Sequence, residues 1–146
     1  MDKHLVNYNT LEELLALEKW YEADCETTNI QLNIVEREEA ESLYFLLSDF
    51  PCEDLVILDE LWVKYSCGRF GFSVQKHIYQ QFKGSKKYTN FCEQVGWREN
   101  GHWKYPHELI FSLDAPSGHL PWLTSGFRIS KQYAREWCTR IETCGL

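Results

Sequence analysis

The spacing of apolar residues restricts this chain to helices more than any single motif does. Trp20, Ala23, Thr27, Ile30 and Ile34 recur at intervals of three and four residues, which places them on one face of an α-helix. Strand-like alternation of apolar and polar residues is scarce along the chain. The pattern therefore predicts an all-α protein with about seven helices.

Capping residues predict where several of these helices begin and end. Thr10 and Glu13 have the spacing of a capping box, in which each side chain bonds to a backbone amide of the other residue. We expect Ser73, Ser85 and Ser130 to cap three later helices. Further expected signals are a short helix over 38–47, a helix start at Pro51, and helix ends at Gly96 and Gly145.

The periodic pattern stops over residues 97–129, which are rich in Gly, Pro, Trp and His. A stretch of this length without regular structure is uncommon in a compact domain and is usually functional or disordered. Its aromatic content favours an ordered loop. Because no linker, repeat or low-complexity segment divides the chain, we expect residues 1–146 to form a single domain, with this long loop before the C-terminal helix.

The charge of the chain is unevenly distributed. Net charge is −7 overall, but residues 64–104 hold 8 basic and 2 acidic residues, a net +6. This favours a local anion site or a solvated helix face over a nucleic-acid surface, which needs broader positive charge. No apolar run approaches the roughly 20 residues of a membrane span, and the first residues lack a signal-peptide pattern. We therefore expect a soluble, intracellular protein.

The six cysteines do not form a recognisable metal or redox motif, since no Cys-x-x-Cys pair occurs. Several fall on apolar helix faces, where cysteine behaves as a small hydrophobic residue. We expect them to be buried thiols. The six are Cys25, Cys52, Cys67, Cys92, Cys138 and Cys144.

Enzyme motifs are also absent from the sequence. There is no P-loop, no Gly-x-Ser-x-Gly elbow and no His-Glu-x-x-His helix. His102 and His107 give only a weak metal signal, and Asp114 with His119 gives no hydrolytic spacing. We predict a protein without catalytic residues and without a metal site, in which His119 braces the long loop.

The segment "WVKYSCGRFGFSVQKHIY" (62–79) predicts a sharp corner between two helices. Its glycines permit the turn, and Phe70 and Phe72 are expected to anchor it in the core. Trp20 and Trp62 are expected on the apolar faces of their helices. Asp24 lies on the face of its helix that should be buried, and a buried carboxylate needs a cation or several donors. Arg69 is the expected partner; a catalytic role for Asp24 as a general base is the alternative.

Several stretches together resemble one family. They are Trp20-x-x-Ala23-Asp24-x-Glu26-Thr27, "FPCEDLVILDELWVKYSCGRFGFSVQKHIY" (50–79), "VGWR" (95–98) and "FSLDAPSGHLP" (111–121). On these motifs the chain is identified as a member of the Genomes Uncoupled Four family, whose members bind porphyrins and stimulate magnesium chelatase in chlorophyll synthesis. The resemblance covers roughly residues 10–121.

The resemblance implies a cupped, all-helical hand whose apolar concave surface takes a flat tetrapyrrole, with loops at about 35–50 and 111–128 closing over it. A porphyrin disc needs apolar walls and a few cations for its carboxylates. The ligand-binding residues implied are Phe50, Phe111, Leu113, His119, Leu120, Trp122, Phe127, Arg128, Lys131 and Arg135. The ligand could be protoporphyrin, its magnesium form, haem or a bilin.

This chain departs from the family in the loop after Pro121. Where chlorophyll-pathway members carry Leu-x-Asn-x-Leu-Arg-Gly, it reads Trp122-Leu123-Thr124-Ser125-Gly126-Phe127-Arg128. The resemblance implies that the protein interacts with the family's partner, the large subunit of magnesium chelatase. A divergent paralogue that binds haem or a bilin, or that serves as a protein-interaction module, is the alternative. The resemblance implies the cytoplasm of a cyanobacterium or the plastid stroma, with peripheral membrane contact allowed.

Overall fold

The computed structural model describes residues 6–122 and 130–146, and within these ranges the protein is all-α, as predicted. Two short 3-10 helices and one β-hairpin, with two residues in each strand, complete the regular structure. The helices and strands are α1 (Asn9–Ala16), α2 (Trp20–Arg37), α3 (Leu43–Leu46), η1 (Leu47–Asp49), α4 (Cys52–Tyr65), α5 (Phe72–Gln80), α6 (Lys87–Gln94), β1 (Arg98–Glu99), β2 (His102–Trp103), η2 (Pro106–Glu108) and α7 (Lys131–Thr143).

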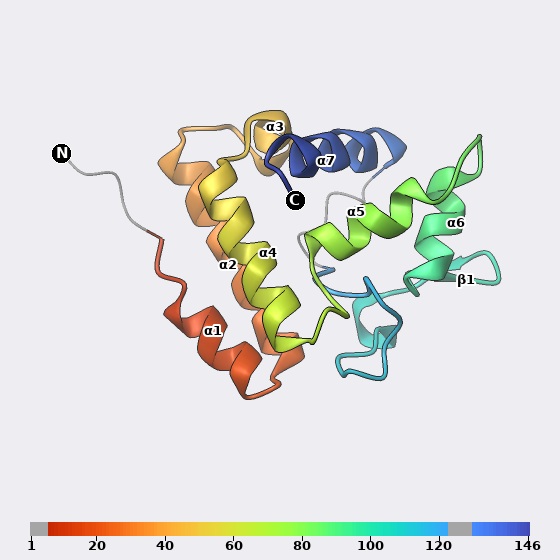
Figure 1. Ribbon diagram of the computed structural model, residues 1–146, viewed down its shortest axis with the longest axis horizontal. Coiled ribbons are helices and arrows are strands. Elements are labelled where there is room, and N and C mark those ends of the chain that lie inside the picture. The colour runs from red at the N-terminus through yellow and green to blue at the C-terminus, as the bar shows by residue number, and fades with distance from the viewer. Residues whose placement is uncertain (1–5, 123–129) are drawn as a thin grey trace.

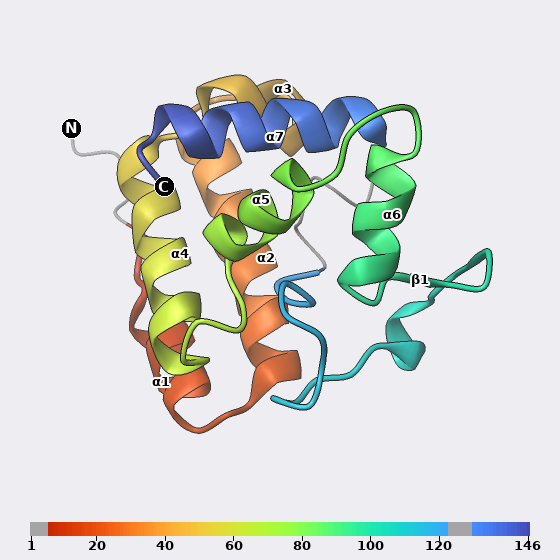
Figure 2. The same cartoon turned by 45° about the vertical axis from the view of Figure 1, so that its right-hand side comes forward.

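Helices α1, α2 and α4 lie side by side, and α7 crosses one end of this group together with α3 (Figures 1 and 2). Helices α5 and α6 extend the fold on the other side of α4. The core runs through the middle of these layers and contains fully buried Leu11, Ile34, Leu58, Trp62 and Trp137. Burial of large apolar side chains such as these is the main stabilising term of the fold.

Two polar interactions join α2 to α4, one inside the core and one at its edge. The indole of Trp62 donates to the hydroxyl of Thr27 at 2.9 Å, so the ring is buried without losing its hydrogen bond. At the far end of α2, Arg37 pairs with Asp54 at 2.5 Å, and the hydroxyl of Tyr8 donates to the same carboxylate. Buried polar groups of this kind fix the register of the two helices because each needs its partner.

The predicted helix caps are confirmed in part. Ser130 does cap α7, since its hydroxyl accepts from the amide of Tyr133, and Gly145 lies just past the end of α7 with φ +84°. The capping box at Thr10 is wrong, because α1 begins at Asn9 with no side-chain cap. Ser85 does not cap α6, which begins at Lys87. The helix expected over 38–47 is confined to α3 and followed by η1.

The predicted cap at Ser73 is also wrong, and the reason lies in the preceding helix. Helix α5 begins one residue earlier, at Phe72, and the amide of Ser73 donates to the carboxylate of Asp59 at 2.8 Å. Asp59 belongs to α4, so the cap is supplied from another helix. Burial raises the pKa of the Asp59 carboxyl, while the hydrogen bond from Ser73 opposes that rise.

The segment between α4 and α5 is a tight corner, as predicted. Its glycines adopt positive φ, +84° at Gly68 and +132° at Gly71, where side chains are disfavoured. Phe70 is fully buried and packs edge-on against Trp20 with ring centroids 5.5 Å apart. The expected ion pair between Arg69 and Asp24 is wrong: the guanidinium of Arg69 donates to the Ala115 carbonyl at 2.8 Å instead.

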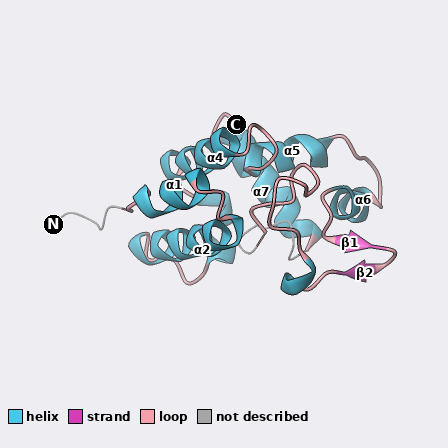
Figure 3. Ribbon diagram, turned by 90° about the horizontal axis from the view of Figure 1, so that it is seen from below, coloured by secondary structure: helices cyan, strands magenta, loops and turns pink. Residues whose placement is uncertain are grey.

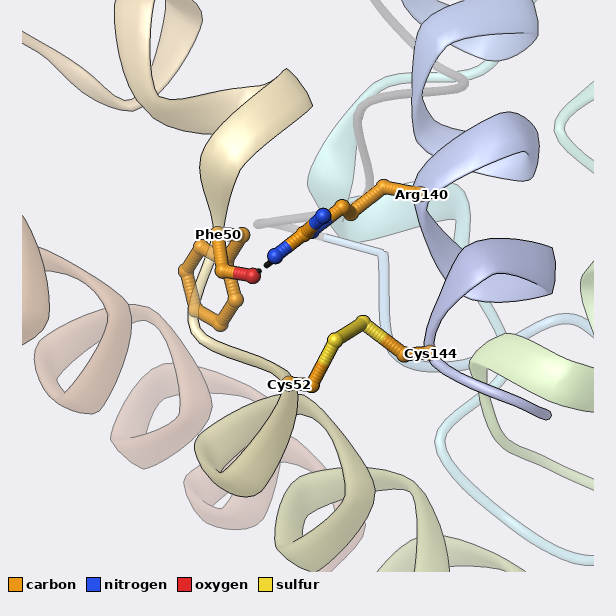
Figure 4. The surroundings of a disulfide bond; sticks show 4 residues. All are labelled: Phe50, Cys52, Arg140 and Cys144. Carbon is orange, nitrogen blue, oxygen red and sulfur yellow. Dashed lines mark hydrogen bonds between the residues drawn. A yellow bond between two sulfur atoms is a disulfide. The ribbon is translucent and has the colours of Figure 1, made fainter.

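A disulfide joins Cys52, at the start of α4, to Cys144, just after α7 (Figure 4). The expectation that all six cysteines are thiols is therefore wrong for this pair, although Cys92 and Cys138 are buried thiols as predicted. Beside the disulfide, the guanidinium of Arg140 donates to the Phe50 carbonyl at 2.8 Å. The end of α7 is thus tied to the start of α4 both covalently and by a hydrogen bond.

The stretch from 97 to 122 is largely irregular but ordered by its contacts. Strands β1 and β2 form a small antiparallel hairpin beside α6, and η2 follows it (Figure 3). No described helix is long and apolar enough to cross a bilayer. Residues 123–129, which include the predicted ligand residues Phe127 and Arg128, lie outside the described residues.

Candidate functional site

One side of α2 presents apolar side chains to solvent rather than to the core. Tyr21 and Leu32 are 51% and 54% exposed, although both belong to residue types that are usually buried. They are separated by eleven residues, or about three helical turns, so they lie on the same face about 16 Å apart along the axis. Cys25 and Thr28, which are partly buried, lie between them on that face.

Aromatic residues from other elements lie near both ends of α2. At its start, Phe111 of the long loop packs edge-on against Tyr21, with ring centroids 5.2 Å apart. At its end lies α3 (Figure 2), where Tyr44 packs against the 62% exposed Phe45 and against Tyr133 of α7. We call Tyr21, Leu32, Tyr44, Phe45 and Phe111 the palm face.

The thiol of Cys25 adds a polar group to the middle of the palm face. Interaction with the Cys25 thiol, one turn further along α2, raises the pKa of the Tyr21 hydroxyl above its ordinary value, and the phenol is neutral at physiological pH. The palm face is accordingly uncharged in its central part, and it suits an apolar, planar ligand better than a strongly charged one.

The long loop is held against the start of α2 by a buried carboxylate. Asp24 accepts a hydrogen bond at 2.8 Å from the backbone amide of Trp122, and both residues are buried. This is the actual role of a carboxylate that was expected to pair with Arg69. Since Asp24 and Tyr21 are neighbours on α2, the same helical turn carries a palm-face residue and the anchor of the loop that borders it.

The corner between α4 and α5 holds the preceding part of the loop. The Arg69 guanidinium donates to the Ala115 carbonyl, and its own backbone carbonyl accepts from the amide of Gly118 at 2.8 Å. The amide of Gly71 donates to the carbonyl of Leu120 at 3.1 Å. The corner between α4 and α5 therefore has a structural role, since it positions the loop that carries Phe111.

His119 braces this loop from inside, as predicted. One ring nitrogen, Nδ1, lies 2.7 Å from the Val95 carbonyl, and Nε2 accepts from the Ile110 amide at 3.0 Å. These partners assign the proton to Nδ1 and leave Nε2 unprotonated. Burial lowers the pKa of His119, against the opposing effect of the Val95 hydrogen bond, so the ring is neutral.

The predicted ligand residues occupy three different environments. Phe50, Leu120 and Trp122 are buried in the core with His119, while Phe111 lies on the palm face and Leu113 is exposed nearby in the chain. Their contact with a ligand stays a prediction.

The two remaining cations of the predicted set, Lys131 and Arg135, belong to α7. Lys131 and Arg135 line a cavity of about 410 Å³ between α5, α6 and α7. Tyr133, between them in sequence, turns instead toward Tyr44. A role of Lys131 and Arg135 at the carboxylates of a palm-face ligand also stays a prediction.

Several palm-face residues were not predicted from the sequence. Tyr21 and Leu32 lie on a different side of α2 from the buried Trp20 and Ile34. The available signal was the recurrence of Tyr21, Cys25, Thr28 and Leu32 at helical spacing on a face without charges.

Comparison with known proteins decides which family this arrangement belongs to. A family described as GUN4-like matches residues 2–136, nearly the whole chain. The chain belongs to the GUN4-like family. The resemblance found from the sequence motifs is thereby confirmed.

Relatives of the GUN4-like family match at similar identity. A protein named ycf53 from Cyanidium caldarium is 34% identical over 78% of this chain and 49% of its own length. A Ycf53-like protein from Synechocystis is 31% identical over 89% of this chain and 58% of its own. A protein from Arabidopsis thaliana named "Tetrapyrrole-binding protein, chloroplastic" is 32% identical over 83% of this chain and 49% of its own. The chain thus spans about half the length of these relatives.

Solved GUN4 structures share the fold. Ligand-free GUN4 from Arabidopsis thaliana matches with a TM-score of 0.72 at 26% identity, over 95% of both chains. GUN4 from Chlamydomonas reinhardtii matches with a TM-score of 0.74 at 28% identity, over 95% of this chain and 91% of that one. The all-helical architecture is therefore shared with these GUN4 structures.

Proposed function

We propose that this protein binds a tetrapyrrole on its palm face and acts as a non-enzymatic regulator or carrier. The observation that supports this most directly is the pair of accessible aromatic contacts near the two ends of α2, Tyr21 with the half-buried Phe111 and Tyr44 with Phe45. Clustered exposed apolar side chains of this kind mark binding surfaces in proteins. A flat macrocycle covers such a face, and the surrounding aromatic rings of the protein supply apolar walls for it.

Membership of the GUN4-like family supports the same class of ligand. One relative is named a tetrapyrrole-binding protein. The chemical form of the ligand, whether protoporphyrin, its magnesium complex, haem or a bilin, is open to measurement. The relatives from Synechocystis and from the Arabidopsis chloroplast support a cyanobacterial or plastid location.

Titration of the purified protein with deuteroporphyrin, magnesium deuteroporphyrin, haemin and biliverdin, followed by quenching of tryptophan fluorescence, tests this function. We expect saturable quenching by at least one of them. The variant Leu32→Ser should bind it about five- to tenfold more weakly, because a half-exposed leucine loses its burial under the ligand. Leu17→Ser is the matched control, since Leu17 is 65% exposed and lies off the palm face.

Two results would contradict the proposal. Absence of saturable quenching with all four pigments would exclude tetrapyrrole binding and leave a protein-interaction module as the better description. Equal loss of affinity in Leu32→Ser and Leu17→Ser would show that the pigment binds away from the palm face.

Stimulation of magnesium chelatase is the finer part of this proposal, and it follows from the family resemblance. An assay of magnesium insertion into deuteroporphyrin, with the chelatase subunits present and this protein added or omitted, measures it. We expect a higher rate with the protein, and a smaller increase with Leu32→Ser than with Leu17→Ser. An unchanged rate at saturating pigment would remove the chelatase from the list of partners.

A further inference from the structure

A cavity outside the palm face is lined by residues from the end of α5, the start of α6 and one side of α7. Its volume of about 410 Å³ falls within the range of sites for small molecules. Helix α7 contributes one continuous stripe, since its lining residues recur at helical spacing. The stripe consists of Lys131, Arg135, Cys138, Thr139 and Glu142.

Positive charge dominates the lining of this cavity. Lys87 of α6 joins Lys131 and Arg135 of α7, and Glu142 is the single acidic residue against them. The carboxylate of Glu142 already accepts a hydrogen bond from the amide of Gln80 at 3.2 Å. Three cations and one carboxylate leave a net charge of +2 around the cavity.

None of the three cations is neutralised by a described residue. The ammonium of Lys87 lies over the ring of Tyr79, 4.3 Å from its centroid, and that of Lys131 donates to the Ser85 carbonyl at 3.3 Å. Arg135 forms no ion pair and no side-chain hydrogen bond with the part of the chain that the structure describes. Positive charges gathered around a cavity raise the local concentration of anions.

We propose that this cavity binds a small molecule carrying a phosphate or pyrophosphate group. A phosphate ester carries a charge of about −1.5 to −2 at neutral pH, which matches the excess of +2. The guanidinium of Arg135 provides the planar fork that suits phosphate oxygens, and the lysines add point charges. Tyr79 and Tyr88 provide aromatic wall for the rest of the molecule.

This site is separate from the palm face and does not depend on it. Lys131 and Arg135 line this cavity, and Arg135 also borders a smaller one with Ser48, whereas Tyr133 contacts Tyr44 at the border of the palm face. The two sides of α7 therefore serve two ligands. This assignment competes with the expectation that the same two cations hold the carboxylates of the tetrapyrrole, and one set of variants decides between them.

Isothermal titration of the full chain at low ionic strength, with inorganic phosphate, pyrophosphate and citrate as probes, tests the proposal. We expect pyrophosphate to bind most tightly of the three probes, and we expect its affinity to fall as salt is added. Arg135→Gln and Lys87→Gln should each weaken it about tenfold or more, because each removes a charged partner of the phosphate. Lys86→Gln is the matched control: it removes the neighbouring exposed charge, which does not line the cavity.

Three outcomes would overturn the proposal. They are no measurable binding of phosphate or pyrophosphate, equal effects of Lys86→Gln and Lys87→Gln, or citrate binding as tightly as pyrophosphate. Thermal unfolding of each variant checks that the substitutions leave the fold intact.

Titration of the same variants with the tetrapyrrole separates this site from the proposed function. We expect Lys87→Gln, at a cavity residue that was never assigned to the tetrapyrrole, to leave tetrapyrrole affinity unchanged. If the variant weakens tetrapyrrole binding and not pyrophosphate binding, the cavity belongs to the pigment and the phosphate assignment is wrong. A wild-type protein that binds pyrophosphate and no tetrapyrrole would instead contradict only the proposed function.

Discussion

The carboxylate of Asp24 accepts the backbone amide of Trp122, 98 positions further along the chain, at 2.8 Å. This bond joins the helix that carries the centre of the palm face to the loop that carries one of its borders. Both groups are buried, so neither can turn to water if the other is removed.

Replacement of Asp24 by Ala should therefore destabilise the protein. The free energy of unfolding should fall by about 1–3 kcal/mol for the Trp122 amide alone, because a buried donor is left without this acceptor. Urea unfolding followed by tryptophan fluorescence measures the loss. Glu22→Ala, which removes an exposed acid from the same helix, is the control and should change stability little. Equal stability of the two variants would show that the Asp24 bond does not hold the loop.

The corner glycines differ in the room around them. A methyl group at Gly71 would lie 2.8 Å from Val63 and 2.9 Å from the Asp59 carboxylate, whereas one at Gly68 would meet nothing within 4 Å. Both positions have positive φ. Gly68→Ala should cost about 1–2 kcal/mol of stability through the backbone alone, and Gly71→Ala about 1–3 kcal/mol more. Thermal unfolding of both variants compares them; a Gly68 variant as unstable as the Gly71 variant would contradict the steric argument.

The disulfide should stabilise the protein because it closes a long loop in the unfolded chain. Its cysteines are 92 positions apart, and for such a loop the expected gain is about 2–4 kcal/mol. Cys144→Ser should lower the urea midpoint, and reductant should lower the midpoint of the wild-type protein but not of this variant. Cys67→Ser removes an exposed free thiol and serves as the control. If reductant leaves the urea midpoint of the wild-type protein unchanged, the disulfide contributes nothing to stability.

Acid should weaken the fold through His119. Burial holds its pKa in the folded protein below the ordinary value of 6.5, so the unfolded chain binds the proton more readily. The stabilising contribution of the neutral ring is fully present above pH 6.5 and declines as pH falls toward the folded pKa. Unfolding free energies between pH 7.5 and 5.5, together with an NMR titration of the His119 ring, test this. A ring that titrates at or above 6.5 would contradict the assignment.

Local sequence signals predicted the parts of the fold that depend on local interactions. Helical spacing located α2, α4 and α7, and the hydroxyl of Ser130 caps α7 from within its own first turn. The cap of α5 was mispredicted because it comes from Asp59, a residue of the preceding helix. Asp24 was correctly expected to be buried, but its partner is a backbone amide, which no side-chain pattern reveals.

The candidate site was harder to predict for the same reason. An aromatic residue in a loop can face the core or the solvent, and composition does not distinguish Trp122, which is buried, from Phe111, which borders the palm face. The disulfide depends on two helix ends meeting in space, so the cysteines' spacing in sequence carried no signal.

The corner and the loop are connected by reciprocal backbone bonds, from Gly118 to the Arg69 carbonyl and from Gly71 to the Leu120 carbonyl. Neither segment can release its amide hydrogens to solvent unless the other moves away. The two should therefore open in a single cooperative event, and deuterium should enter the Gly71 and Gly118 amides at the same rate. A ligand that packs against Phe111 would slow exchange at both amides, although the corner lies away from the palm face.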